Sequence, residues 1–274
     1  MTRWCDNDLF YVSASQQFRI LTRDKNMSTV DKALSVLNLF SESTPNLGLS
    51  EIARQLGWDK SNIQRYVSDL TRHGILEQSP KDKSYYLGPS LTRLSMLRDL
   101  THPVAGEVTR ALHDLAEVTG ETAHSSMLVG DRLMTTGIVE TKIKGTRVYI
   151  DPAEALPFHA TASGLAFLSA SPDARVDEVL SGKLLRFTSN TEMDRIKLLR
   201  QIEKVQGTGY AKASGTFESD VVGIAAAIIG FRGNAVGAIA VATPASRFTA
   251  NTESATSGHV MKVASQVSRI HGAK

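Results

Sequence analysis

A set of polar side chains recurs at helical spacing between residues 60 and 72. If this segment is a helix whose buried face is centred on Ile63, the opposite face carries Ser61, Arg65, Ser68 and Arg72. Arginine pairs bidentately with guanine, asparagine and glutamine pair with adenine, and serine can meet a base or a phosphate. These residue types favour a helix that reads base edges in the major groove of DNA.

The N-terminal part of a recognition helix usually reads the bases. We therefore expect base contacts from Ser61, Asn62, Gln64 and Arg65. The expected phosphate contacts are Lys60, Arg72, Lys81 and Lys83. A different interpretation is an ordinary solvated helix face with unrelated lysines in a turn, because most polar helix faces only meet water.

The neighbouring helices decide between these interpretations. Residues 49–56 predict a short helix with Ser50 as its N-cap and Gly57 as its C-terminal stop. Asp59 can cap the next helix, which is expected to run to His73. Two short helices joined by a tight turn are typical of a helix-turn-helix, which favours DNA binding.

The segment after these helices predicts a wing. Two strands, residues 75–78 and 84–87, flank the polar turn 79–83. Together with the helices they predict a winged helix-turn-helix. Some winged helices bind protein instead, but such a face should expose apolar anchors, and this one exposes serines and arginines.

An earlier helix is expected to begin at Ser28, because apolar residues recur there with the period of a helix. The face that we expect it to bury carries Val30, Ala33, Leu34, Leu37 and Phe40. After Gly88-Pro89, a linker helix is expected to run to about Leu100.

The second half of the chain mixes helices with hairpin strands and predicts an α+β domain. The expected helices are 104–119, 160–170, 173–181, 191–206 and 252–270. The expected strands are 121–129, 132–140, 221–231 and 235–243. We expect four segments in all: a leader (1–26), the winged domain (27–88), a linker helix (89–102) and the second domain (103–274).

Bulk composition limits the possible functions. The net charge is only +3, so bulk charge would not hold nucleic acid and any DNA contact must be local and shaped. The one cysteine, Cys5, excludes an intramolecular disulfide. The first 26 residues lack the apolar core of a signal peptide, and the longest apolar run, 221–231, is too short to cross a bilayer. We expect a cytoplasmic protein without membrane contact.

Other chemistries lack their residues. None of the seven histidines lies in a His-x3-His pair or a carboxylate-flanked cluster, so we expect no metal and no cofactor. His159 is expected to be structural and to hold its loop. No catalytic pair can be named, so we do not expect an enzyme. The alternative function is a GAF-like enzyme or nucleotide sensor fused to a winged-helix protein-interaction module.

Several motifs, in order, resemble the IclR family of transcriptional regulators. They begin with Leu49-Ser-Glu-Ile-Ala-Arg-Gln-Leu-Gly and Lys60-Ser-Asn-Ile-Gln-Arg-Tyr-Val. In the second half, Leu156-Pro-Phe-His-Ala-Thr-Ala-Ser-Gly and Ala240-Val-Ala-Thr-Pro-Ala-Ser-Arg continue the match. The resemblance covers about residues 28–270. It implies a GAF-like effector domain, an operator in double-stranded DNA, and a homodimer or dimer of dimers that represses or activates transcription.

The resemblance also implies a small-molecule pocket in the second domain. The residues that it places there are Ser126, Ile150, Pro152, Thr161, Ala162, Ser163, Ala213, Gly223, Ala240 and Ala242. His124 and Ser125 are further polar candidates. The family often has polar residues where this chain has Ala213, Gly223, Ala240 and Ala242. We therefore expect a bulkier, more apolar effector, such as an aromatic acid whose carboxylate meets the amides at the start of helix 160–170. Alternatively, these small residues only allow close packing against a helix.

Overall fold

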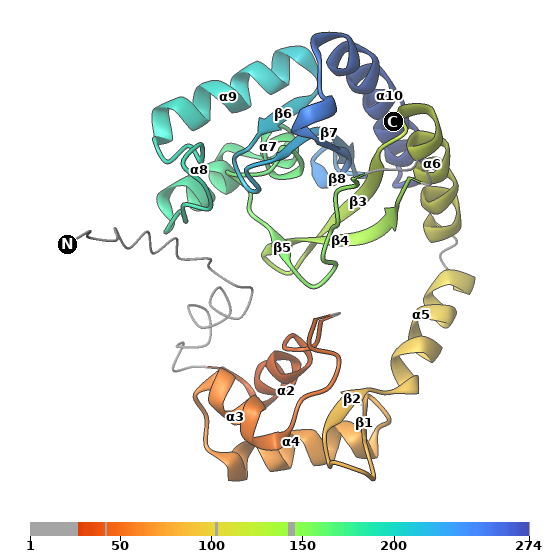
Figure 1. Cartoon of the computed structure of the whole chain (residues 1–274), viewed down its shortest axis with the longest axis vertical. Coiled ribbons are helices and arrows are strands. Elements are labelled where there is room, and N and C mark those ends of the chain that lie inside the picture. The colour runs from red at the N-terminus through yellow and green to blue at the C-terminus, as the bar shows by residue number, and fades with distance from the viewer. Residues whose placement is uncertain (1–26, 42, 102–103, 142–145, 274) are drawn as a thin grey trace, which may run out of the picture. The chain divides into compact units, whose positions relative to one another are not determined.

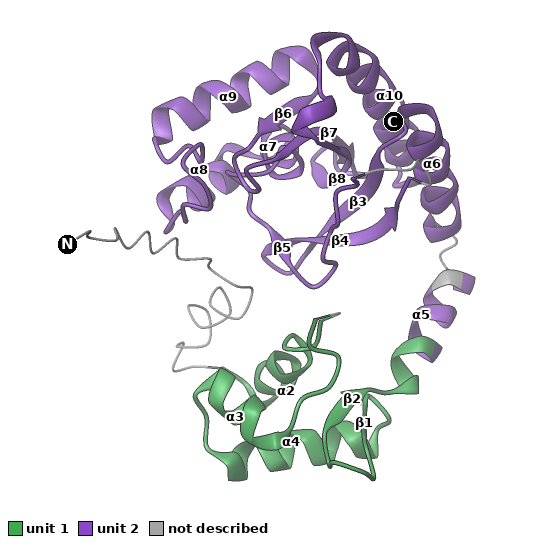
Figure 2. Ribbon diagram, in the orientation of Figure 1, with its two compact units in different colours: residues 1–92 green, residues 93–274 purple. Residues whose placement is uncertain are grey.

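The computed structural model describes residues 27–41, 43–101, 104–141 and 146–273. The leader expected at residues 1–26 lies outside them. The chain divides into two compact units, Met1–Thr92 and Arg93–Lys274, and the boundary falls within helix α5 (Pro89–Thr101) (Figure 2). The chain is therefore a two-domain α+β protein, as predicted.

The first unit is a small helical domain with a hairpin. Helices α2 (Thr29–Leu37), α3 (Leu49–Leu56) and α4 (Lys60–Arg72) precede strands β1 (Leu76–Gln78) and β2 (Tyr85–Leu87), which pair antiparallel (Figure 1). The bounds of α3, α4 and the hairpin agree with the predicted ones to within one residue. Buried side chains from all three helices and both strands form one core. This core fixes which face of α4 is left for a partner.

Two predicted details of this unit are wrong. The N-cap of α3 is Gly48, not Ser50, which lies inside the first turn of the helix. In α2, Val30 and Leu34 are 65% and 50% exposed, although we expected them in the core. The helix ends at Leu37, so the residues after it leave the helical phase, and Leu39 and Phe40 turn inward.

The second unit is built on one antiparallel sheet. Its strand order is β5-β4-β3-β8-β7-β6. The strands are β3 (Thr122–Val129), β4 (Arg132–Val139), β5 (Ala155–Leu156), β6 (Ala211–Ser214), β7 (Val221–Ile229) and β8 (Ala235–Pro244). The two long hairpins were predicted. The edge strands β5 and β6 were not, because two and four residues are too few to show a period.

Helices cover both faces of this sheet. Helices α6 (Val104–Thr119) and α10 (Ala250–Ile270) pack on one face and on each other. Helix α7 (Ala162–Ser169) packs on the other face over β7 and β8, and α9 (Arg195–Thr208) packs on α7. Helix α8 (Asp173–Ser181) precedes α9 and adds Val176 and Leu180 to the core on the α7 side. Two separate hydrophobic clusters, one on each side of the sheet, follow from this layering.

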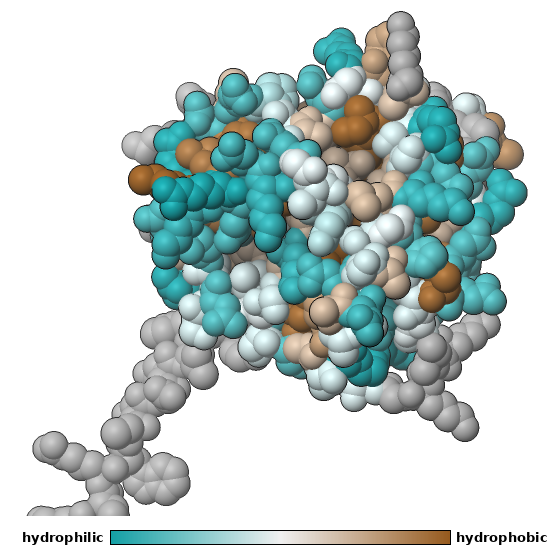
Figure 3. Space-filling model, turned by 90° about the horizontal axis from the view of Figure 1, so that it is seen from above, coloured by the Kyte–Doolittle hydropathy of each residue, from teal (hydrophilic) through white to brown (hydrophobic). Residues whose placement is uncertain are grey.

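Apolar side chains are unevenly exposed. On the face seen in Figure 3, hydrophobic residues are scattered among polar ones. Helix α5 is different, because four of its large apolar side chains are exposed: Leu94, Met96, Leu97 and Leu100. None of the helices in the described part of the chain is long and apolar enough to span a membrane.

Candidate functional site

The outward face of α4 carries the polar residues singled out from the sequence. Ile63, Tyr66 and Val67 are buried, which turns the opposite side of the helix to solvent. The exposed residues include all seven predicted contacts of this helix: Lys60, Ser61, Asn62, Gln64, Arg65, Ser68 and Arg72. The helix therefore presents one continuous polar face that contains donors and acceptors suited to base edges.

Arg65 is held by the neighbouring aromatic residue Tyr66, which the sequence did not single out for this role. Its guanidinium carbon lies 5.2 Å from the ring centroid of Tyr66, and its Nη2 donates to the Tyr66 hydroxyl at 3.3 Å. Tyr66 in turn packs edge-on against Trp58, with 6.2 Å between ring centroids. This stack limits the conformations of Arg65 before any partner binds.

Two other arginines of the first unit, one on α4 and one on α3, are partly compensated. Arg72 forms an ion pair with Asp69, and Arg54 forms one with Glu51. Arg72 is therefore less available for a phosphate than its position in the sequence suggested.

The wing tip presents Lys81 and Lys83 to solvent. Lys83 has a φ of 61°, a left-handed conformation unusual for a residue with a side chain. Asp82 closes the turn by accepting from the amide and the hydroxyl of Ser84. These bonds lower the pKa of Asp82 to about 2, so the carboxylate offsets one lysine. The tip carries a weak positive charge.

A cavity of about 80 Å³ lies in the second unit between α7, the sheet and two loops. It brings together eight of the ten residues expected at the effector site: Ile150, Thr161, Ala162, Ser163, Ala213, Gly223, Ala240 and Ala242. The other lining residues are His124, Val148, Asp151, Glu154, Leu156, Ala160, Thr216, Phe217, Glu218 and Val221.

Small residues from neighbouring strands form the floor of this cavity. Ala213 pairs with Gly223 across β6 and β7, and Gly223 pairs with Ala242 of β8. In the next row, Ala240 pairs with His124 of β3. The antiparallel register turns the side chains of paired residues to the same face of the sheet.

Close packing accounts for at least one of these small residues. A Cβ atom on Gly223 would lie 3.1 Å from the Cβ of Ala162 in α7. Ala240 is 1% exposed and belongs to the core that α7 covers. The small residues therefore serve both interpretations, since they let α7 approach the sheet and leave space beside its first turn.

Two polar candidates and Pro152 lie outside the cavity. Ser126 pairs with Ala238, one row further along the sheet under α7, and its hydroxyl lies 3.4 Å from the Ala238 carbonyl oxygen. Ser125 faces the α6 side and lies 3.2 Å from the Thr136 hydroxyl. Pro152 is exposed in the turn whose neighbours Asp151 and Glu154 do line the cavity. The alternation of side chains along β3 explains the exclusion of Ser125.

The start of α7 offers hydrogen-bond donors to the cavity. Thr161 is its N-cap and accepts from the amide of Gly164 at 3.0 Å. The amide of Leu165 bonds the Thr161 carbonyl. Among the described residues, no acceptor meets the amides of Ala162 and Ser163. Free amides at a helix N-terminus are suited to an anionic group.

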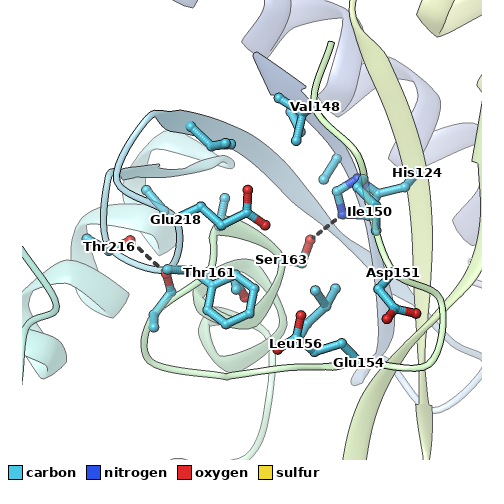
Figure 4. Close-up of a pocket in the computed structure, with 18 residues that line it drawn as sticks. His124, Val148, Ile150, Asp151, Glu154, Leu156, Thr161, Ser163, Thr216 and Glu218 are labelled. Atoms are coloured by element: carbon cyan, nitrogen blue, oxygen red, sulfur yellow. Dashed lines mark hydrogen bonds between the residues drawn. The ribbon is translucent and has the colours of Figure 1, made fainter. Parts of the chain in front are cut away.

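His124 lies at the sheet side of the cavity, where its Nε2 is 3.3 Å from the hydroxyl of Ser163 (Figure 4). Its side chain is 7% exposed, and its Nδ1 has no hydrogen-bond partner among the described residues. Burial lowers the pKa of His124 to about 4, so the ring is neutral at neutral pH.

Three carboxyl groups, which the sequence did not single out, also line the cavity. Asp151 and Glu154 lie in the loop before β5, and Glu218 lies in the loop between β6 and β7 (Figure 4). Burial, with smaller contributions from the charges of Asp151 and Glu218, raises the pKa of Glu154 to about 7. Burial, together with Asp220, also raises the pKa of Glu218. Sequence could not find these residues because nothing in it shows that the two loops meet.

Glu154→Gln is expected to stabilise the protein at high pH only. Because the folded-state pKa of Glu154 lies above its ordinary value of 4.5, ionisation opposes folding. The cost is absent below about pH 4.5, grows up to about pH 7 and is complete above it. After allowance for solvent screening, the gain at about pH 8 is on the order of 1 kcal/mol, or about 2–4 °C in Tm.

Thermal unfolding at several pH values measures this gain. Glu117→Gln, an exposed position on α6, makes the same chemical change outside the cavity. An equal gain at acidic and alkaline pH would contradict the burial of the Glu154 charge.

His159 holds its loop, as predicted. Its Nε2 donates to the carbonyl oxygen of Leu185 at 2.8 Å, and its ring packs 6.0 Å from that of Phe187. Burial lowers the pKa of His159. It does not line the cavity.

Two family models match this chain. Residues 100–269 match the model described as "Bacterial transcriptional regulator IclR C-terminal", and residues 29–80 match the "IclR helix-turn-helix domain". Two of the most similar curated proteins are named as HTH-type transcriptional regulators. XynR of Escherichia coli is 27% identical over 81% of this chain and 88% of its own length. BhcR of Paracoccus denitrificans is 28% identical over 87% of this chain and 85% of its own length.

Solved structures agree with these matches. An IclR transcriptional regulator from Silicibacter sp. TM1040 is 36% identical, with a TM-score of 0.82 over 90% of this chain and 97% of its own. An IclR homologue from Microbacterium hydrocarbonoxydans was solved in complex with 4-hydroxybenzoate. It has a TM-score of 0.75 and 23% identity, and the match covers 90% of this chain and 100% of its own. The second likeness concerns the fold alone.

Proposed function

The chain belongs to the IclR family of bacterial transcriptional regulators, and from this premise we propose that α4 reads an operator while the cavity beside α7 binds the effector. Residues 27–88 then form the DNA-binding domain, 89–102 the linker helix and 103–274 the effector-binding domain. Regulators of this family bind operators and small-molecule effectors. The finer proposals concern which residues of this chain do so.

We propose base contacts from Ser61, Asn62, Gln64 and Arg65, because they occupy the exposed first two turns of α4. Lys60 and the wing residues Lys81 and Lys83 are proposed to contact phosphates, with smaller contributions from Ser68 and Arg72. The observation that carries this proposal is the uninterrupted polar face opposite a fully buried one. It is the arrangement that a major-groove helix requires.

Selection from a pool of random duplexes tests this function. The full chain is expected to enrich an inverted repeat whose half-sites lie one helical turn, or a multiple of it, apart. Recovery of no common sequence after repeated rounds would contradict operator reading.

We also propose that the effector carries a carboxylate on an apolar body. The free amides of Ala162 and Ser163 would accept the carboxylate, and Phe217 and the alanine floor would contact the body. The aromatic acid 4-hydroxybenzoate bound to the Microbacterium homologue supports this class of ligand. Binding would change the spacing of two DNA-binding domains through α5, which requires a coupling of only about 1–3 kcal/mol.

The regulator is proposed to act as a homodimer or a dimer of dimers, because α5 exposes apolar side chains that a second copy can cover. Leu94, Leu97 and Leu100 are 46%, 51% and 80% exposed. Burying them on association would remove apolar area from water. A dimer would also place two copies of α4 on one operator.

Leu97→Glu is therefore expected to shift the protein toward monomer and to reduce operator affinity about 100-fold or more, since each half-site alone binds weakly. Light scattering on a sizing column gives the mass, and anisotropy gives the affinity. Leu199→Glu, at an exposed leucine of α9, is the matched control. A Leu97→Glu protein that keeps its mass and affinity would contradict this role of α5.

A further inference from the structure

Three acidic residues line the cavity beside α7. Asp151 and Glu154 approach it from one loop and Glu218 from another, on opposite sides of the space (Figure 4). Among the described residues that line it there is no lysine and no arginine. A cavity built only for an anion would not need three carboxyl groups, because each repels the ligand when ionised.

These carboxyl groups have few partners inside the protein. Asp151 accepts from the amide of Ala153 at 2.9 Å and caps its own turn. Neither Glu154 nor Glu218 forms an ion pair with any cationic side chain in the described part of the chain. The raised pKa of each shows the same imbalance, since burial and neighbouring carboxylates act on it without an opposing positive charge. A bound cation would relieve this cost.

His124 gives a second, independent sign of a ligand. The residue is only 7% exposed, and it lines the same cavity. Ser163 satisfies Nε2, but Nδ1 has no partner among the described residues. A buried polar atom without a partner costs free energy unless a ligand or water meets it. Because the ring is neutral, it does not repel a cation.

The geometry favours an organic cation over a metal ion. No group of three or more His, Cys, Asp or Glu residues among those described lies close enough to hold a metal. The carboxyl groups instead surround a space whose floor is Ala213, Gly223, Ala240 and Ala242. An apolar body can lie on that floor while its charged end meets the acids.

We propose that the effector carries a protonated amine on a compact apolar body, and that Glu154 and Glu218 bind the amine. The inference rests on the proposed role of this cavity as the effector site. It is compatible with a carboxylate at the other end of the same molecule, near the amides of Ala162 and Ser163. The effector is then dipolar, with its two charges at opposite ends of the cavity.

Matched ligand pairs test this proposal by calorimetry on the full chain. Each pair, benzylamine with benzyl alcohol and isobutylamine with isobutanol, keeps the body and changes only the charge. At about pH 8 at least one amine is expected to bind roughly tenfold or more tightly than its alcohol, because the buried carboxylates gain a partner. The amine should bind more weakly at about pH 6, where Glu154 is protonated.

Variants then locate the interaction. Glu154→Gln and Glu218→Gln are each expected to reduce the amine preference severalfold, whereas Glu117→Gln, exposed on α6, leaves it unchanged. The probe 4-(aminomethyl)benzoate, which has both charges, is expected to bind more tightly than benzylamine. Equal binding of amines and alcohols, or an amine preference that survives both cavity variants, would overturn the proposal.

Other outcomes separate this proposal from the function on which it rests. If benzoate binds more tightly to the Glu154→Gln variant and no amine is preferred over its alcohol, the proposed amine group of the effector is overturned. The cavity then remains the proposed effector site. Binding of MgCl2 or CaCl2 that Glu154→Gln abolishes also overturns the amine, in favour of a metal. Failure of the wild-type chain to bind any selected operator would instead contradict the proposed function.

Discussion

Arg65→Ala is expected to weaken operator binding by about 10- to 100-fold and to leave the fold intact. Arg65 is exposed on the first half of α4 and held against Tyr66. A bidentate pair with guanine contributes about 1–3 kcal/mol of discrimination, which gives this range. Arg65 itself is exposed, and Tyr66 keeps its packing against Trp58 without it, so thermal unfolding should change little. Anisotropy with a selected operator and calorimetry of unfolding measure the two quantities.

Lys81→Ala on the wing is the control for this prediction. If Lys81 contacts a phosphate, its loss should weaken binding to the selected and the scrambled duplex alike. It should also reduce the slope of log affinity against log salt concentration by about 1. Arg65→Ala should instead weaken binding to the selected duplex far more than binding to the scrambled one. Equal losses on both duplexes would assign Arg65 to the backbone and contradict base reading.

Gly164→Ala is expected to destabilise the effector-binding domain by about 3 kcal/mol or more. A Cβ atom at this position would lie 2.4 Å from the Cα of Phe158 and 2.5 Å from its carbonyl oxygen. Backbone atoms cannot move aside as a flexible side chain can, and Phe158 is held against Phe167, with 5.3 Å between ring centroids. The substitution should therefore displace the start of α7 and with it the cavity.

Gly207→Ala is the matched substitution. Gly207 lies in helix α9 with no atom within 4 Å of its added Cβ. Alanine is favoured over glycine inside a helix by about 1 kcal/mol, so this variant should be slightly stabilised. A Gly164→Ala protein as stable as the wild type would show that α7 can move away from the Phe158 loop.

Regular periodicity made most of the fold predictable. Helix α6 was expected at 104–119 and is found at Val104–Thr119, because its apolar residues recur with the period of a helix. The same reasoning was wrong for Val30 and Leu34 of α2, which are exposed, and right for Leu37 and Phe40, which pack into the core. Strands β5 and β6 were not predicted, because only their pairing with β4 and β7 defines them.

The candidate sites were predictable to different degrees. The face of α4 depends on local period alone, and its exposed residues are those expected. The floor of the cavity followed from the resemblance, whereas Asp151, Glu154 and Glu218 enter it through loops brought together by long-range folding. Ser126 was expected in the cavity but lies two residues beyond His124 on the same face of β3, where α7 covers the sheet. The charge of the cavity, which bears most on the effector, was therefore the part that sequence could not supply.

Anisotropy titration of the full chain with a selected operator and a scrambled duplex of equal composition tests the central claim most directly. At physiological salt, an operator-reading regulator is expected to prefer the selected duplex by about a thousandfold or more. Equal affinity for the two duplexes would contradict the assignment of this chain as a sequence-specific regulator.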